Sequence, residues 1–142
     1  MRVEEVMTSD VETLPMGVSV AEVAEKMKQL DVGFIPVRDA LDRKLGGVVT
    51  DRDIVTRCVA ERLDPNQATV DRVLSDKVLY CFAGDDISDA AQSMAKAQVY
   101  RLVVLDNREE KNLAGIITLA DILRHDKTGL AADTAQKIAE AA

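Results

Sequence analysis

The sequence contains the same short pattern twice, at residues 47–53 and at residues 115–121. Each copy has a glycine, a short apolar run, a threonine, and an aspartate three positions after that threonine. A run of β-branched residues that leads into a Thr-x-x-Asp step predicts a buried strand that continues directly into a helix. Any fold for this chain must therefore contain two such strand-to-helix steps.

The polar residues of the pattern are suited to the start of a helix. We expect Thr50 and Thr118 at N-cap positions, where a hydroxyl accepts a hydrogen bond from an unpaired backbone N–H group. Asp53 and Asp121 then fall at the third helical residue, near the positive end of the helix dipole. Each pair thus predicts a capping box.

The similarity between the two copies extends over most of the chain. Upstream of the motif the offset is 67 residues, so that Val3 corresponds to Val70, whereas Thr118 lies 68 residues after Thr50. The register changes by one between residues 39 and 45. A one-residue difference in length at that point predicts a surface loop between two strands. Repetition over this length indicates two copies of one structural unit.

The repeat divides the sequence into three parts. We expect repeat 1 at residues 1–69, repeat 2 at residues 70–127, and an additional helix or tail at residues 128–142. A repeat of roughly 65 residues is close to the lower limit for independent folding, so we expect the two copies to pack on each other.

Periodicity and turn residues predict the elements of each repeat. Repeat 1 is expected to contain a short helix at 3–7, an extended piece at 11–14, a helix at 20–30, strands at 33–37 and 45–50, and a helix from 51 to about 62. Repeat 2 is expected to contain the same elements at 70–74, 79–82, after 86, at 101–105, 113–118 and 119–125, followed by an alanine-rich helix at 133–141. The predicted fold class is α+β, with the order β-α-β-β-α twice and short sheets covered by helices.

Two finer expectations follow from single residues. Pro36 has no backbone N–H group, so one edge of its strand should lack a hydrogen bond to a neighbouring strand. The helix after Thr50 should direct Val55, Cys58 and Val59 toward the core.

Composition excludes several classes of function. The net charge of −7 argues against nucleic acid as a general partner, because binding phosphates needs a basic face. The N-terminus lacks the apolar segment of a signal peptide, and no apolar run is long enough to span a membrane. Cys58 and Cys81 have neither paired spacing nor a neighbouring histidine, so we expect reduced core thiols in a cytoplasmic protein and no metal site.

The doubled order of elements, the run at residues 32–39 and the two Gly-apolar-Thr-x-x-Asp motifs resemble the CBS domain. Residues 1 to about 127 resemble a tandem CBS pair, often called a Bateman module. The resemblance implies a pseudo-twofold pair of repeats with two clefts between them. Such clefts commonly bind AMP, ADP, ATP or S-adenosylmethionine as regulatory ligands, without a required cofactor. Such pairs also commonly form homodimers.

The resemblance assigns binding roles to residues of both repeats. Asp53 and Asp121 match the position that binds ribose, since an ionised carboxylate accepts hydrogen bonds from two neighbouring hydroxyls. Thr50 and Thr118 match a position that meets phosphate together with helix N-terminal amides. Arg101 matches a basic phosphate-binding position, and Arg52 is a second candidate. The strands that line the adenine side are expected to contribute Gly33, Phe34, Ile35 and Pro36 in repeat 1, and Tyr100, Arg101 and Leu102 in repeat 2.

Simpler interpretations exist for the same residues. Both Thr-x-x-Asp pairs make sense as capping boxes without any ligand. Arg52, Arg57 and Arg101 are equally consistent with solvated surface charges or with partners of nearby acidic residues. The leading function is an adenine-nucleotide sensor that regulates an unknown protein in trans. The alternative is a dimerisation or scaffold module with vestigial clefts. An enzyme is not expected, because the one histidine, His125, has no evident catalytic partner.

Overall fold

Each repeat folds around an antiparallel hairpin whose second strand runs directly into a helix. In repeat 1 the hairpin is β2 (Phe34–Arg38) with β3 (Leu45–Thr50), and in repeat 2 it is β5 (Arg101–Leu105) with β6 (Leu113–Thr118). Both hairpins contain an irregularity in register near their loops, at residues 37–38 and 104–105. The strand-to-helix steps predicted by the doubled motif are confirmed.

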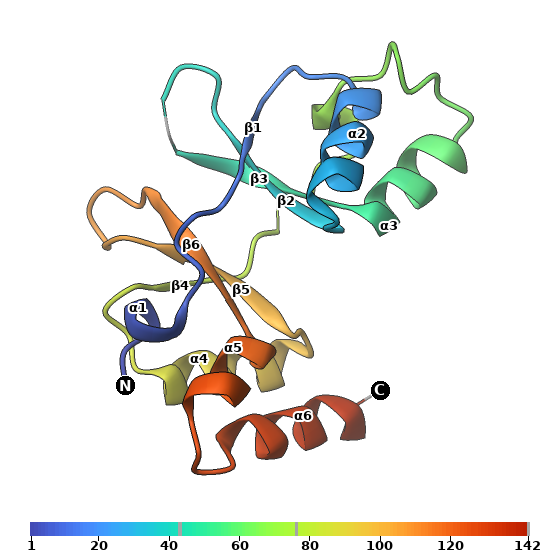
Figure 1. Ribbon diagram of the computed structural model, residues 1–142. Coiled ribbons are helices and arrows are strands. Elements are labelled where there is room, and N and C mark those ends of the chain that lie inside the picture. Colours follow the sequence, from blue (N-terminus) through green and yellow to red (C-terminus); the bar gives the residue numbers. More distant parts are fainter. Residues whose placement is uncertain (43, 76, 142) are drawn as a thin grey trace. The chain divides into compact units, whose positions relative to one another are not determined.

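The computed structural model describes residues 1–42, 44–75 and 77–141. These residues form two compact units, each with one three-stranded sheet and helices packed against it (Figure 1). The first unit consists of residues 12–78, and the second unit consists of residues 1–11 together with residues 79–142. The α+β class is confirmed.

The third strand of each sheet is short and pairs in parallel with the hairpin. β1 (Leu14–Pro15) pairs with β2, and β4 (Tyr80–Phe82) pairs with β5. The N–H group of Val103 donates to the carbonyl of Leu79 at 3.1 Å, but its counterpart Pro36 has no N–H group to donate. This accounts for the shorter β1 and confirms the expectation for Pro36. The expected strand at residues 11–14 lies farther along the chain, because the paired residues are those opposite Val37 and Arg38.

The long helix of each repeat begins and ends in the same way. α2 (Val20–Leu30) is capped by Ser19, and α4 (Ile87–Ala97) by Asp86. Ser19 accepts a hydrogen bond from the N–H group of Glu22 at 3.1 Å. Both helices end at a residue in the left-handed conformation, Asp31 or Gln98, as is common at C-termini.

The short helices at the start of the repeats are exchanged between the units. α1 (Val3–Val6) packs in the core of the second unit, whereas the 3-10 turn η2 (Val70–Arg72) packs in the core of the first. The chain after α1 then pairs with Ile116 of β6, and the chain after η2 pairs with Val48 of β3. Each unit is therefore completed by the beginning of the other repeat.

Two motif glycines make this exchange sterically feasible. A Cβ atom on Gly115 would clash with the carbonyl oxygen of Thr8. A Cβ atom on Gly47 would lie 2.8 Å from the carbonyl oxygen of Ser75 and 2.7 Å from a side-chain carbon of Leu74. The glycine that opens each motif is thus required by the backbone of the exchanged segment.

The helix after Thr50 differs from its prediction. It begins as α3 (Asp51–Ile54) and continues as a π-helical turn, η1 (Val55–Val59), in which the N–H group of Ala60 donates to the carbonyl of Val55. Cys58 is buried as expected, but Val55 and Val59 are 58% and 64% exposed, so their predicted inward direction is wrong. The wider turn changes the phase of the helix, and the regular period assumed from the sequence does not apply.

The second unit contains two further helices. α5 (Leu119–His125) follows Thr118, and α6 (Leu130–Glu140) follows Gly129, whose φ angle is +87°. α6 starts three residues before the predicted helix because Gly129 reverses the chain there. It packs against α4 and α5 (Figure 1). Among the described residues, no helix combines the length and apolar character that a membrane crossing needs.

Candidate functional site

The hairpin register brings the predicted binding residues of each repeat together. Phe34 lies opposite Thr50 in the first unit, and Arg101 lies opposite Thr118 in the second. Residues that are well separated in sequence thus become neighbours at the end of the hairpin where the helix begins. Arg101 and Thr118 place a cation and a hydroxyl side by side, whereas the first unit has an aromatic ring at the position of Arg101.

The next hydrogen bond at this end of the hairpin shows a second difference. In the first unit the N–H group of Asp51 donates to the carbonyl of Gly33 at 2.9 Å, and the Asp51 carboxylate occupies the space beside Gly33. In the second unit the N–H group of Leu119 donates to the carbonyl of Tyr100 at 2.8 Å. The same backbone step therefore presents a carboxylate in the first unit, but an apolar and an aromatic side chain in the second.

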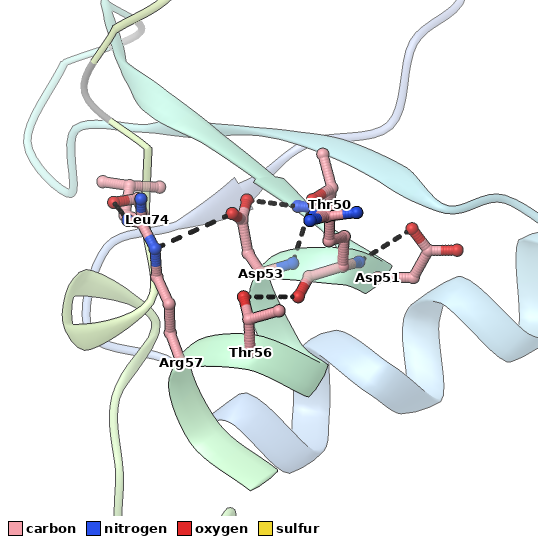
Figure 2. A network of polar contacts seen from close by, with 7 residues as sticks. Thr50, Asp51, Asp53, Thr56, Arg57 and Leu74 are labelled. Carbon is pink, nitrogen blue, oxygen red and sulfur yellow. Dashed lines mark hydrogen bonds and ion pairs between the residues drawn. The ribbon is translucent and has the colours of Figure 1, made fainter. Parts of the chain in front are cut away.

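The Thr50–Asp53 pair forms a full capping box (Figure 2). The N–H group of Thr50 donates to Asp53 Oδ2 at 2.9 Å, and the N–H group of Asp53 donates to Thr50 Oγ1 at 3.1 Å. The other carboxylate oxygen, Oδ1, lies 3.9 Å from Arg57 Nε, and Arg57 also donates to the carbonyl of Leu74 at 3.0 Å. One carboxylate oxygen is thus committed to the helix start, and the other faces an arginine.

The Thr118–Asp121 pair repeats this arrangement in a more buried setting. Asp121 Oδ2 accepts from the N–H group of Thr118 at 2.9 Å, and Oδ1 accepts from Arg124 Nη1 at 2.8 Å. Asp121 is only 5% exposed. His125 Nδ1 lies 2.9 Å from the carbonyl oxygen of Asp121. A ribose hydroxyl that reached this carboxylate would have to share it with Arg124.

The sequence left Arg57 as either a surface charge or a partner of a nearby acidic residue, and Arg124 was not predicted to contact Asp121. Both lie one helical turn after their aspartate, at i+4 and i+3. Oppositely charged residues at these spacings meet on one face of a helix, so the signal was present in the sequence.

The remaining predicted residues differ in accessibility. Ile35, Pro36 and Leu102 are buried within their sheets, whereas the side chain of Arg52 is exposed at the start of α3. The side chains of Ile35, Pro36 and Leu102 therefore pack inside the protein and are not presented to solvent.

The second unit has a cavity of about 570 Å³ at the end of its hairpin. Its volume lies within the range of small-molecule sites in proteins, roughly 300–1,000 Å³. Three predicted residues line it, namely Tyr100, Arg101 and Thr118. The other lining residues, none of which was predicted, are Leu119, Ala120, Leu123, Ala131, Ala132 and Ala135.

Among the described residues that line this cavity, Arg101 is the one cation and none is a carboxylate. The three alanines come from α6, which lies outside the repeats, so comparing the two repeats gave no signal for them. Asp121 is not among the lining residues. The cavity therefore combines a polar end, at Arg101 and Thr118, with an apolar body.

Comparison with known proteins decides the family. The family model of the CBS domain matches this chain twice, at residues 3–60 and 70–127. The chain belongs to the CBS domain family. The two matches give a tandem CBS pair, as the doubled motif predicted.

Several known proteins are similar to this CBS pair. Hypoxic response protein 1 of Mycobacterium tuberculosis is 36% identical over 121 residues, which is 85% of this chain and 82% of the relative. A crystal structure of Hypoxic Response Protein I, with two coordinated zinc ions, has a TM-score of 0.78 at 34% identity and covers 89% of this chain and 99% of its own.

More distant CBS structures share the fold. The CBS domain protein PAE2072 from Pyrobaculum aerophilum, complexed with AMP, has a TM-score of 0.78 at 21% identity, over 96% of this chain and 99% of its own. The CBS domain pair of MJ0100, in complex with 5′-methylthioadenosine and S-adenosyl-L-methionine, has a TM-score of 0.73 at 22% identity, over 87% of this chain and 94% of its own.

Zinc sites in proteins usually have three or four Cys, His, Asp or Glu side chains that converge on one point. Across residues 1–42, 44–75 and 77–141, no group of three or more His, Cys, Asp and Glu side chains converges. Burial, with Asp85 nearby, raises the pKa of the Cys81 thiol to about 12. Zinc binding requires the thiolate, so this raised pKa adds to the cost of using Cys81 as a ligand. Cys81 and Cys58 are both buried, and they lie in different units.

Proposed function

We propose that this CBS pair is a regulatory, non-catalytic module that binds an adenosine-containing nucleotide where each hairpin runs into its helix. The observation that carries the proposal is the position of Arg101 opposite Thr118 at the polar end of the cavity, with Asp121 bonded to the N–H group of Thr118 beside it. A guanidinium and a hydroxyl suit phosphate oxygens, and the apolar walls suit a planar base. The partner that responds to the bound ligand is a protein acting in trans.

Two fold relatives support the choice of ligand. PAE2072 is complexed with AMP, and the MJ0100 pair with 5′-methylthioadenosine and S-adenosyl-L-methionine. Asp53 and Asp121 are the proposed acceptors for ribose hydroxyls, each with one carboxylate oxygen that is not bonded to the capped N–H group. Binding would then exchange part of the arginine contact for contacts with the sugar.

We further propose that phosphates favour the second unit. Its hairpin end presents Arg101, whereas the first unit presents the Asp51 carboxylate beside Gly33. A carboxylate repels a phosphate at short range, and Arg52 on the next residue offsets this charge only in part. The two sites should therefore rank AMP, ATP and S-adenosylmethionine differently.

Calorimetry with AMP, ADP, ATP and S-adenosylmethionine tests the proposal. At least one of them should bind with micromolar to sub-millimolar affinity, about −5 to −8 kcal/mol. Asp53→Ala and Asp121→Ala should each remove one binding event. Urea unfolding of both variants controls for the lost capping box, which contributes about 0.5–2 kcal/mol to stability. Absence of heat and of any thermal shift with all four compounds at millimolar concentration would favour a scaffold without ligand.

Arg101→Ala separates phosphate recognition from base recognition. Because the guanidinium would meet phosphate oxygens and not the base, the variant should lose at least tenfold in affinity for ATP, but little for adenosine. The matched comparison is Arg52→Ala, which should have the same selective effect at the other site. Equal losses for adenosine and ATP would contradict the phosphate role.

A second candidate function, homodimerisation, is favoured by exposed apolar side chains on the helices after the two motifs. Val55, Val59 and Leu123 are 58%, 64% and 66% exposed. Surfaces of this kind often mark protein interfaces, and closed dimers are the commonest oligomers. Sedimentation velocity at micromolar concentration should give twice the chain mass of 15.5 kDa, and Val59→Asp should reduce it to that of the monomer. A parent protein that sediments as a monomer would exclude this assembly.

A further inference from the structure

α6 forms one wall of the cavity in the second unit. Ala131, Ala132 and Ala135 face the hairpin end and α5 across it. Since α6 follows repeat 2 in the chain and has no counterpart in repeat 1, this wall is particular to the second unit. In Figure 1, α6 is the last helix and runs beside α4 and α5.

The contacts that hold α6 in place are apolar, and Leu130 at its start packs against the core of the second unit. The buried residues of α6 are Ala131, Thr134 and Ile138. The Thr134 hydroxyl donates to the carbonyl of Leu130 within the same helix, at 2.7 Å. The Gln136 amide likewise donates to Glu140, so both of these side-chain hydrogen bonds stay inside α6.

Open space lies along both sides of the helix. Besides the cavity on the α5 side, a second one of about 500 Å³ lies on the α4 side, between residues such as Gln92 and Lys96 of α4 and Asp133 and Lys137 of α6. A ligand that fills one of these spaces adds contacts to α6 that the protein alone does not provide.

We propose that α6 is part of the nucleotide-binding site of the second unit, and that a ligand in the cavity holds α6 against α4 and α5. The proposal rests on the proposed function. It adds residues of α6 to the binding site, and it makes the docking of α6 the structural change that follows ligand binding. A ligand that contacts α6 binds the docked state more tightly than the undocked state and therefore raises the docked population. The apparent affinity scales with the docked fraction, so a change that lowers this fraction weakens binding in proportion.

The chemistry of the site matches a ligand with an anionic end and an apolar, planar body. Phosphate or carboxylate oxygens would meet Arg101 and Thr118, while the base would lie against the alanines of α6 and beside Tyr100. Tyr100 is 54% exposed. The protein has two tyrosines and no tryptophan, so Tyr80→Phe leaves Tyr100 as the single strong ultraviolet fluorophore at the site.

The test uses the Tyr80→Phe protein with AMP, ADP, ATP and S-adenosylmethionine as probes. A compound that gives heat by calorimetry should also change Tyr100 fluorescence over the same concentration range. Hydrogen exchange of the amides in 130–140 should slow at least fivefold at saturation. Ala135→Leu fills the cavity and should weaken this binding at least tenfold, whereas Ala139→Leu, on the same helix but outside the cavity lining, should change it less than twofold.

Ala132→Leu provides a second blocking variant if Ala135→Leu disturbs folding, because Ala132 is exposed yet lines the cavity. Three outcomes separate the hypotheses. If a leucine variant weakens ligand binding, and the ligand slows hydrogen exchange of α6 in the Tyr80→Phe protein, the inference is supported. Binding that neither leucine variant affects, with unchanged exchange in α6, overturns the inference and leaves the proposed function standing. No binding of any probe to the parent overturns both.

Discussion

The two units are built from the same repeat, yet only the second is covered by an additional helix. Ala91 of α4 is 1% exposed beside α6, whereas its counterpart Ala24 of α2 is exposed. Both alanines continue the apolar face of their helix, so local sequence does not distinguish them. The comparison shows that a segment outside the repeat decides whether an apolar position belongs to the core or to the surface.

The ends of the two hairpins teach a related lesson. Thr50 and Thr118 cap their helices with the same bonds and at the same distances. The residue after the cap is Asp51 in the first unit and Leu119 in the second, and it changes the charge beside the strand end. A shared backbone step therefore supports two chemically different sites.

The largest expected effect on stability comes from α6, the helix that covers only the second unit. Ile138→Ala removes the largest buried side chain of α6 and should lower the stability of the second unit by about 2–5 kcal/mol. Native-state hydrogen exchange should show reduced protection in α4, α5 and α6, while α2 and β3 keep theirs. An equal loss of exchange protection in both units would show that they unfold as one cooperative structure, and would contradict the view that α6 stabilises only the second unit.

The next effect tests what the units share. Gly115→Ala should destabilise by about 1–3 kcal/mol, because the new methyl group meets the backbone of Thr8. Gly47→Ala should cost less, because its nearest contact is the movable side chain of Leu74 and the carbonyl oxygen of Ser75 lies at 2.8 Å, farther than that of Thr8 from Gly115. Urea unfolding measures both.

Gly84→Ala is the control for these two variants. A Cβ atom there meets nothing within 4 Å, so its effect should stay within about 0.5 kcal/mol. If Gly47→Ala and Gly115→Ala were as mild as Gly84→Ala, the close approach of the exchanged segments would be wrong.

The smallest effect appears only in alkali and is confined to the second unit. The pKa of Cys81 is about 12 in the folded protein, against an ordinary value of 9.0. Between these values the unfolded chain loses the thiol proton while the folded protein keeps it. Stability should therefore fall as pH rises above 9, by up to about 1.4 kcal/mol per pH unit.

Cys81→Ala should remove this alkaline slope, and Cys58→Ala, which retains the Cys81 thiol, should keep it. Urea midpoints at pH 8, 9 and 10 provide the measurement. A parent and a Cys81→Ala protein with the same slope would mean that the thiol ionises as readily in the folded protein as in the unfolded chain.

Much of the fold was predictable because its signals are local. The capping boxes at Thr50 and Thr118 follow from residues three positions apart, and the shorter β1 follows from the missing N–H group of Pro36. Arg101 and Thr118, which the hairpin register places opposite each other, were both named through the resemblance to the CBS domain. For the candidate site, the sequence thus predicted the residues at the strand ends.

Other features were missed because their causes are not local. The directions of Val55 and Val59 depend on a π-helical turn that the apolar pattern does not reveal. The i+4 and i+3 spacings could have predicted that Arg57 and Arg124 contact Asp53 and Asp121. Which carboxylate oxygen each arginine contacts depends on the hydrogen bonds of the capping box.

The sequence by itself determined the order of elements and the strand-to-helix steps, because these rest on backbone preferences and periodicity within a few residues. The two repeats followed from self-similarity along the chain, and the family from the resemblance of the doubled motif to the CBS domain. Only the tertiary structure decided that α1 completes the second unit and that η2 completes the first. It also decided that α6 forms one wall of the cavity at Arg101 and Thr118. These features depend on which distant surfaces bury apolar area together. That choice is made by the packing of the whole chain and not by any single segment.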